Sequence, residues 1–418
     1  MRLTPLLLFL APFGSLLAQA PVADANVSSC VTCHSALEGP LSKPAQLMKD
    51  DVHIKNGLSC ASCHGGDPAA ADMTEAMSLQ KGFTGKFDRR KIPELCARCH
   101  SDAAYMRKFK PQQRVDQLAL YKTSVHGKRL AQGDTAVAIC IDCHSVHDIR
   151  EVRDVFSPVY PTKLPQTCSR CHSDAARMKN YNIPTDQFDK YQRSVHWEAV
   201  SRRSDLSAPV CASCHGSHGA APPGVENVAR VCGSCHVVFQ NLFDQSPHKA
   251  AFDTLGFPGC VVCHSNHEIR RPILEMLGVA EAAVCVKCHT QGDAGYAAAQ
   301  TMRQRMEQLQ SALRSAEGTV QSAERSGMEM SDARLQLASA NEELIKARLQ
   351  IHRFRVEAVE APVGAGLTAA GKSYELGVAG LHERDVRQRG LLGSLAAILI
   401  TVAGLWMLIR RTERRGTQ

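Results

Sequence analysis

The chain has 418 residues, which is long enough for two domains of ordinary size. Only 5% of its residues are aromatic and two are Trp, so the composition argues against an ordinary hydrophobic core. The formal net charge of +8 would suit a nucleic-acid partner if it formed a free basic surface, but the motifs described below give those charges a different role.

The first 25 residues have the pattern of a secretory signal peptide. Met1 and Arg2 precede an apolar run over residues 6–17, which is too short to span a bilayer. Small-x-small sites place the cleavage after Ala20 or after Ala25. We therefore expect residues 1–25 to be removed on export, and an exported chain is consistent with dense use of cysteine.

All 18 cysteines lie in nine copies of one motif, Cys-x-x-Cys-His, within residues 26–294. The motifs pair Cys30 with Cys33, Cys60 with Cys63, Cys96 with Cys99, Cys140 with Cys143, Cys168 with Cys171, Cys211 with Cys214, Cys232 with Cys235, Cys260 with Cys263 and Cys285 with Cys288. The histidines that follow them are His34, His64, His100, His144, His172, His215, His236, His264 and His289. This spacing is typical of covalent c-type haem attachment, in which two sulfurs bind the porphyrin and the histidine binds its iron.

Zinc sites and disulfides are the alternatives to haem at these motifs. Zinc sites also use Cys-x-x-Cys pairs, but zinc chemistry does not require a histidine directly after each pair. Nine c-type haems would supply much of the buried apolar surface, so the domain should be largely unfolded without its cofactors. Their ionised propionates would change the net charge from +8 to about −1 when oxidised and about −10 when reduced. We expect the basic residues to pair with propionates rather than with nucleic acid.

Residues 26–294 also contain an internal repeat that holds two haem motifs per copy. Copies begin at Tyr121, Tyr191 and Phe243, each with a histidine five residues later, a Cys-x-x-Cys-His-x-x-His segment and a closing Cys-x-x-Cys-His motif. A degraded first copy begins shortly before Cys60 and includes the Cys60 motif. It has Asp67 where the other copies have a spare histidine. Seven spare histidines recur in register with the motifs and are predicted to be distal iron ligands: His53, His126, His147, His196, His218, His248 and His267.

Nine haems need nine distal ligands, so two remain to be assigned. Only His352 and His382 lie outside the haem segment. We predict that His352 is an eighth distal ligand, because an antiparallel hairpin would return it to the level of the haem domain. His382, a Met, a Lys or an open iron site serves the remainder; the Met alternatives are Met48, Met73, Met77, Met106, Met178 and Met276.

Residues 295–360 are predicted to form a helical hairpin. Apolar residues alternate spacings of four and three over residues 302–323 and again over residues 337–358. Ser326-Gly327 separates the two arms, and Ser331 is a suitable N-cap. The alternative is a dimeric coiled coil, in which residues 295–360, called the stalk, would make an oligomer with a second chain. Residues 361–390 are predicted to be a linker, which ends the second arm, followed by a juxtamembrane helix from about residue 367.

Residues 391–409 contain no charge and are long enough to span a bilayer as a helix. Trp406 lies near the far end, where aromatic residues meet the membrane surface. The basic tail, residues 410–418, predicts a cytoplasmic C-terminus, and the export signal places the haem domain in the periplasm. The alternative is a buried core helix.

The nine Cys-x-x-Cys-His motifs and the recurring spare histidines resemble those of the multihaem c-type cytochromes of the doubled-CxxCH and cytochrome c3-like kind. The resemblance covers about residues 28–294. The resemblance implies a periplasmic or extracellular electron carrier of anaerobic respiration. Tetrahaem quinol dehydrogenases have an N-terminal anchor, whereas this chain has its anchor at the C-terminus. Pentahaem nitrite reductases typically carry a Cys-x-x-Cys-Lys motif, and the sequence contains none.

The sequence therefore predicts a mainly α fold with much irregular loop. A haem-stacked nonahaem domain of di-haem repeats is followed by an antiparallel helical hairpin and one C-terminal transmembrane helix. The function expected is electron relay through about nine mostly bis-His haems (haem c) in a respiratory chain, with redox proteins as partners. A catalytic role is the less favoured alternative, namely a reductase with one open haem that acts on a small nitrogen or sulfur oxyanion.

Overall fold

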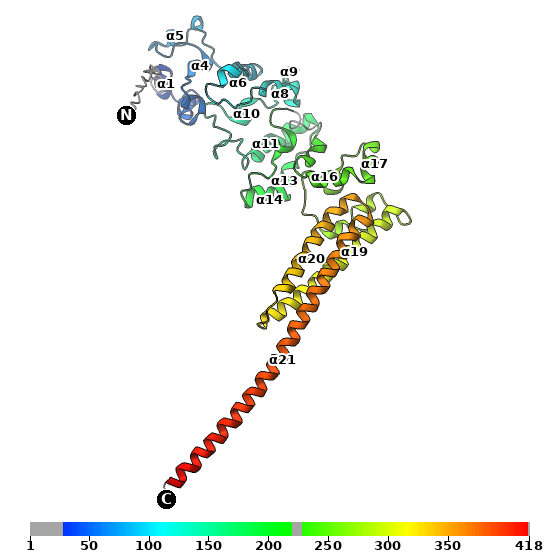
Figure 1. The fold of residues 1–418 in the computed structure, drawn as a ribbon. Helices are drawn as coiled ribbons and strands as arrows, with labels where there is room; N and C mark the ends of the chain where they lie inside the picture. The colour runs from blue at the N-terminus through cyan, green and yellow to red at the C-terminus, as the bar shows by residue number, and fades with distance from the viewer. Residues whose placement is uncertain (1–27, 220–227, 417–418) are drawn as a thin grey trace, which may run out of the picture. The chain divides into compact units, whose positions relative to one another are not determined.

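The computed structural model describes residues 28–219 and 228–416 (Figure 1). The predicted signal peptide lies outside these residues. Within them the chain forms α-helices, short 3-10 helices and loops, and no β-strand. Contacts divide the chain into two units, one made of Met1–Phe188 and Ala199–Pro223, and the other made of Asp189–Glu198 and Gly224–Gln418. The expected mainly α fold is confirmed.

The first unit consists of short helices joined by turns and loops. Its helices are α1 (Ser29–Ser35), α2 (Lys43–Leu47), α3 (Val52–Lys55), α4 (Cys60–His64), α5 (Met73–Ala76), α6 (Ile92–His100), α7 (Ala103–Met106), α8 (Gln117–Thr123), α9 (Val125–Ala131), α10 (Cys140–His144), α11 (Leu164–His172), α12 (Ala175–Met178) and α15 (Cys211–His215). The chain passes between the units within α13 (Gln187–Gln192) and α14 (Val195–Arg202). A small apolar cluster of Leu130, Val137 and Ile139 is buried in this unit. So small a cluster is consistent with a domain whose apolar filling comes mainly from cofactors.

The second unit begins its haem part with short helices and continues into long ones. Its elements are η7 (Val228–Ser234), α16 (Val237–Asp244), α17 (Pro247–Leu255), α18 (Cys260–His264), η8 (Leu274–Met276), η9 (Cys285–Lys287), α19 (Ala294–Arg325), α20 (Ser331–Gln350), η10 (Ile351–Arg353) and α21 (Val356–Gly416). The largest core of the described residues lies here, where Met306, Leu309, Val359 and Val363 are fully or almost fully buried.

The helices α19 and α20 form the predicted antiparallel hairpin, and the first half of α21 packs against both of them. The buried positions of α19 and α20 coincide with the predicted heptad positions, for example Leu309, Leu313, Leu337 and Leu344. Asp293 caps α19 by accepting a hydrogen bond from the N–H of Tyr296. The stalk is therefore a three-helix bundle rather than a two-helix hairpin alone.

The second arm ends earlier than the sequence predicts. The helix α20 stops at Gln350, η10 follows, and Phe354 takes a left-handed backbone conformation with φ of 51°. The segment predicted to be a linker lies inside α21, together with Pro362. Small residues are needed there because a Cβ atom added at Gly366 would lie 2.9 Å from a methyl group of Leu309.

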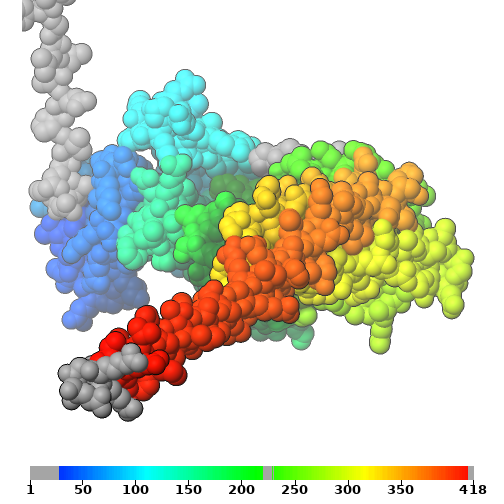
Figure 2. All heavy atoms as spheres, turned by 60° about the horizontal axis from the view of Figure 1, so that its bottom comes forward, coloured from blue at the N-terminus to red at the C-terminus, as the bar shows by residue number. Residues whose placement is uncertain are grey.

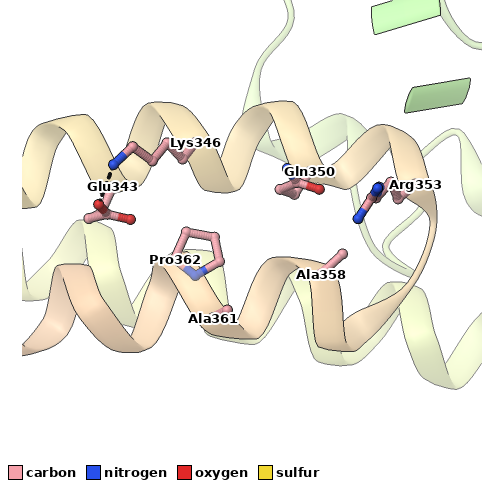
Figure 3. A pocket seen from close by; sticks show the side chains of 7 residues that line it. All are labelled: Glu343, Lys346, Gln350, Arg353, Ala358, Ala361 and Pro362. Atoms are coloured by element: carbon pink, nitrogen blue, oxygen red, sulfur yellow. Dashed lines mark hydrogen bonds and ion pairs between the residues drawn. The ribbon is translucent and has the colours of Figure 1, made fainter. Parts of the chain in front are cut away.

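A shallow open groove runs between α20 and the first turns of α21 (Figure 3). Glu343, Lys346 and Gln350 line one side, and Ala358 and Pro362 line the other. Lys346 forms an ion pair with Glu343 at 2.6 Å. The groove is lined by charged and small side chains, without the histidines that carry the haem chemistry.

The end of α21 projects beyond the bundle, as the red end of the space-filling view shows (Figure 2). This helix is long and apolar enough to cross a membrane. The large apolar side chains within residues 391–409 are all about half exposed or more. Arg410 lies over the ring of Trp406 at 4.3 Å, so a basic residue and an aromatic residue meet where the apolar stretch ends.

Candidate haem sites

Four Cys-x-x-Cys-His motifs each form a single helical turn. The segments of α4, α10, α15 and α18 are five residues long, and each begins at the first cysteine and ends at the histidine. Residues three and four positions apart share one face of a helix. The turn therefore presents both sulfurs and the imidazole to the same side, which is the arrangement that covalent haem attachment requires.

Three further motifs lie within longer helices. The Cys30 motif is part of α1, and the motifs that begin at Cys96 and Cys168 form the last turns of α6 and α11. In α11 the sulfur of Cys171 accepts a hydrogen bond from Arg177 at 2.9 Å, a contact that the sequence did not predict. A thioether sulfur is only a weak acceptor. We therefore expect Arg177 to leave Cys171 and pair with a haem propionate once the sulfur is bound to porphyrin.

Two motifs depart from the uniform helical turn that nine copies of the same motif suggest. The first cysteines, Cys232 and Cys285, lie in the 3-10 helices η7 and η9, and the second cysteines, Cys235 and Cys288, follow directly after those helices end. The N–H of His236 and of His289 still donate to the carbonyl oxygens of Cys232 and Cys285, at 2.9 Å and 3.0 Å. One α-type hydrogen bond thus keeps each motif closed although the backbone before it is wound more tightly.

The motifs also differ in how far their sulfurs are exposed. The second cysteine is exposed at Cys33, Cys63, Cys235 and Cys288, whereas the other fourteen cysteines are partly buried. These four thiols therefore lie at the surface of the polypeptide rather than inside it. They stay predicted attachment sites, and their thioether bonds would lie at haem edges that the protein covers less.

Seven of the motif histidines lie opposite another histidine. The distances between ring centroids are 5.9 Å for His53/His100, 6.2 Å for His64/His147, 6.1 Å for His126/His172, 6.1 Å for His144/His218, 6.3 Å for His196/His236, 5.9 Å for His248/His289 and 6.2 Å for His264/His352. Each pair combines one motif histidine with one of the predicted distal ligands. All seven distances lie between 5.9 Å and 6.3 Å, which indicates that the pairs share one structural role.

The distance itself fits one metal ion between two imidazoles. A metal–imidazole nitrogen bond is about 2 Å long, and the nitrogen is about 1 Å from its ring centroid, so two rings on one iron have centroids about 6 Å apart. The pairs therefore fit the bis-His coordination of a six-coordinate haem, with the adjacent cysteines placed for its covalent attachment.

The pairs follow two rules along the chain. Four pairs join the first histidine of a repeat to the motif that closes it, as in His126/His172. The remaining pairs join the first haem motif of a repeat, called the central motif here, to a histidine further along the chain. Examples are His64/His147 and His144/His218. His352 takes this second role for His264, after the last repeat has ended. The sequence did not predict which distal histidine faces which motif.

His352 is held by η10, the short turn between α20 and α21. Its Nδ1 is 3.1 Å from the carbonyl oxygen of Leu349, and its ring is 4.9 Å from that of Phe239. The next residue, Arg353, donates to Gln245 Oε1 at 2.6 Å. Phe354 follows, and its ring centroid is 4.0 Å from that of His248. The turn between α20 and α21 thus contributes to the pair His264/His352 and contacts the pair His248/His289.

Four histidines lie outside the seven pairs. His34 has its Nδ1 2.9 Å from the carbonyl oxygen of Leu41. His215 belongs to the first unit and His267 to the second, and both stay predicted ligands. His382 is exposed on α21. In the degraded repeat, Asp67 forms an ion pair with Lys81 at 2.7 Å instead of occupying a ligand position.

Burial favours the neutral form of several of the paired imidazoles. Desolvation by burial lowers the pKa values of His100, His126, His172, His196, His264 and His352. Burial, together with His218 and His100, lowers the pKa of His144 to about 4. Iron ligation requires a neutral imidazole with a free nitrogen, so the sites are prepared for metal at neutral pH.

Sulfurs of successive motifs are neighbours. The thiols of Cys96 and Cys140 are hydrogen-bonding partners, as are those of Cys168 and Cys211 and those of Cys232 and Cys260. Electrostatic interactions also link Cys60 to Cys30, Cys63 to Cys99, Cys143 to Cys168, and Cys263 to both Cys285 and Cys288. The motifs therefore follow one another in space in the order of the sequence, from Cys30 to Cys211 in the first unit and from Cys232 to Cys285 in the second.

The residue after a central motif takes a backbone conformation that favours glycine. Gly65 and Gly216 follow two of these motifs with φ of 68° and 73°, whereas Ser145 and Ser265 follow the other two with φ of 72° and 65°. The two serines combine these values with ψ near 180°, a region that is essentially restricted to glycine. The positive φ ends the helical turn directly after the histidine. Sequence analysis missed this feature, although Gly65 and Gly216 were a signal for it.

Comparison with known proteins supports the same cofactor. A family model described as cytochrome c3 matches residues 52–173 and 208–290. The chain is a multihaem c-type cytochrome. It is also similar to a protein named C-type polyheme cytochrome OmcC from Geobacter sulfurreducens, with 25% identity over 215 residues. That match covers 46% of this chain and 26% of the relative, so the chain spans about a quarter of the length of that protein. No solved structure matches the cytochrome.

Proposed function

We propose that this cytochrome is a membrane-anchored conduit that relays electrons through nine covalently bound haems. The observation that carries the proposal is the set of seven histidine pairs with a common spacing, joined by neighbouring cysteine sulfurs in sequence order. A haem that is ligated on both faces exchanges electrons without binding a substrate at its iron. We place the haem domain in the periplasm and its role in a respiratory chain, with redox proteins as donor and acceptor.

The protein's own residues would hold, space and shield the cofactors. Bound haem supplies one-electron chemistry between ferric and ferrous iron. Motif histidines and their partners would both ligate the iron of such a haem, and a ligand set held by the fold would need to move little on reduction. Cysteines of neighbouring motifs, such as Cys96 and Cys140, lie close together and would hold the two attached haems near each other. The similarity to a polyheme cytochrome is consistent with this role, although the relative is a much longer protein.

The proposal is tested on the full-length cytochrome purified in detergent after maturation. We expect an intact mass that exceeds the processed chain by nine haems, and a ferric spectrum that is low-spin at eight or nine of them. The reduced haems should also transfer electrons to a soluble acceptor that is too large to reach the axial positions. Eight or fewer haems in a fully matured sample, or a mainly high-spin spectrum, would contradict the conduit.

His34 supports a second candidate, a reductase with one open haem. Within the described part of the first unit, the four histidines outside motifs are His53, His126, His147 and His218, and each faces a different motif histidine. The haem at Cys30 and Cys33 would then have an open iron or a different sixth ligand. Such an iron could reduce a small nitrogen or sulfur oxyanion.

Carbon monoxide distinguishes the two candidates because it binds ferrous iron only where the sixth position is open or weakly held. We expect at most one equivalent to bind to the reduced cytochrome. Removal of the motif by Cys30→Ala and Cys33→Ala should abolish that binding, whereas His382→Ala serves as a control on an exposed histidine. Turnover of nitrite or sulfite that disappears with CO binding would favour the reductase.

A further inference from the structure

Two of the seven histidine pairs include an imidazole that meets a carboxylate. His53 Nδ1 is 3.0 Å from Asp51 Oδ1, and His289 Nδ1 is 3.1 Å from Asp293 Oδ1. When Nε2 faces iron, Nδ1 carries the proton, and the Nδ1–H group donates a hydrogen bond to the carboxylate oxygen. The two sites concerned are the pair His53/His100 and the pair His248/His289.

Other ring nitrogens meet neutral acceptors. His64 Nδ1 is 3.0 Å from the carbonyl oxygen of Thr84 and 3.1 Å from that of Gly85. His352 Nδ1 is 3.1 Å from the carbonyl oxygen of Leu349. These bonds orient the ring but place no full negative charge beside it. These four imidazoles therefore fall into two classes, which differ in the charge of the hydrogen-bond acceptor.

Asp51 is fixed in place by the backbone around it. Its side chain is only 6% exposed. Its Oδ1 accepts a hydrogen bond from the N–H of His53 at 2.8 Å, and its Oδ2 accepts one from the N–H of Ile149 at 2.8 Å. The carboxylate cannot rotate away from the imidazole without breaking these bonds. Its charge thus acts on a nearby iron site through little intervening water.

Asp293 is held in a similar way at the start of α19. Its Oδ1 accepts a hydrogen bond from the N–H of Tyr296 at 2.7 Å, and its Oδ2 accepts one from the N–H of Thr290 at 2.7 Å. The side chain is 38% exposed, so water screens its charge more than that of Asp51. We therefore expect the same effect at His289 with a smaller size.

The planes of the two rings differ between these sites and most of the others. The rings are 86° apart in the pair His53/His100 and 85° apart in the pair His248/His289. The other five pairs range from 9° to 57°. Perpendicular imidazoles leave two iron d orbitals nearly equal in energy, which moves the ferric EPR signal to low field. Both carboxylate-bound sites should therefore be spectroscopically distinct.

We propose that Asp51 and Asp293 are positioning residues that lower the reduction potentials of these two haems and hold their axial rings perpendicular. A carboxylate acceptor makes the imidazole a stronger electron donor to iron. Ferric haem carries one more positive charge than ferrous haem, so the carboxylate stabilises the oxidised form more. This inference rests on the proposed haem ligation and adds a potential profile to it. The third and the ninth haem in sequence order would each have a lower potential than the same haem without its carboxylate.

The test is a redox titration of the full-length cytochrome followed by EPR. In the parent protein, the two low-field signals should disappear on reduction. Asp51→Asn keeps an oxygen beside His53 but removes the charge. We expect it to raise the reduced-to-oxidised ratio of one low-field haem at least tenfold at fixed potential, which is about 59 mV for a one-electron couple. Asp293→Asn should raise the reduced-to-oxidised ratio of the other low-field haem by a smaller factor.

Asp72→Asn is the matched control. Asp72 caps α5 by accepting hydrogen bonds from the N–H groups of Thr74 and Glu75, so it shares the capping role without a histidine partner. It should leave both low-field potentials unchanged. If Asp51→Asn disrupts folding because the bond to Ile149 is lost, Asp293→Asn tests the inference independently.

Unchanged low-field potentials in a folded Asp293→Asn variant and in a folded Asp51→Asn variant would overturn the inference. The absence of low-field signals from a parent protein with nine low-spin haems would also overturn it, while leaving the conduit intact. Loss of low-spin haem from the parent protein would instead contradict the proposed function itself. The two failures are therefore distinguishable.

Discussion

Replacement of His352 by Ala should open one haem and leave the others unchanged. The His352 ring centroid is 6.2 Å from that of His264, with the planes 17° apart, which fits the two faces of a single iron. Loss of that ligand should convert about one ninth of the iron from low spin to high spin. Removal of a half-buried ring that also contacts Phe239 should lower the free energy of unfolding by about 1–3 kcal/mol.

The assay combines haem content, the ferric spectrum and CO binding on the purified variant. We expect nine covalent haems to remain, one high-spin signal to appear, and the reduced variant to bind one equivalent of CO more than the parent protein binds. Added imidazole should restore the low-spin spectrum. Arg353→Ala is the matched control, because Arg353 lies in the same turn but donates to Gln245 rather than facing a motif histidine. An unaltered low-spin spectrum in His352→Ala would refute the assignment and point to another ligand on that iron.

Three further sets of variants test other features of the cytochrome. Ser265→Gly should raise the free energy of unfolding by about 1 kcal/mol, because φ of 65° strains serine but not glycine; thermal unfolding of the holoprotein measures this, and a loss of stability would argue against the backbone conformation. Gly65→Ala should do the opposite, since its Cβ would overlap the carbonyl oxygen of Gly82. Replacement of Cys211 and Cys214 by Ala should abolish stable protein rather than give a clean eight-haem product, because the apolar filling of that layer leaves with the haem; normal yield and stability would contradict this. Truncation after Arg389 should give a soluble cytochrome with an unchanged haem spectrum, and a changed axial-ligand spectrum would mean that the last part of α21 contributes to a haem site.

Much of the architecture could be predicted from short-range patterns. The heptad positions Leu309 and Leu337 are buried as the pattern indicates. The apolar residues 391–409 form the end of a helix that could span a membrane. Such features depend on residues within one or two turns of each other, so the sequence displays them directly.

The rest depended on contacts between distant segments. The end of the second arm was predicted near residue 360, because Pro362 and the glycines after it resemble a linker. In the structure Gly366 allows α21 to pack closely on Leu309, a tertiary requirement that no local pattern reveals. Asp51 and Asp293 were missed as partners of His53 and His289, although they lie only two and four residues away. A search for acidic residues next to the ligand histidines would have found both.

The continuity of α21 has a mechanical consequence. From Val356 to the start of the apolar stretch at Leu391 the helix runs without interruption, which at 1.5 Å per residue is about 50 Å. With residues 391–409 in a bilayer, this rod has no hinge between the lipid surface and the turn that holds His352. The last haem sites would then stand at a nearly constant height above the membrane. A redox partner that exchanges electrons there would have to reach those sites at that height.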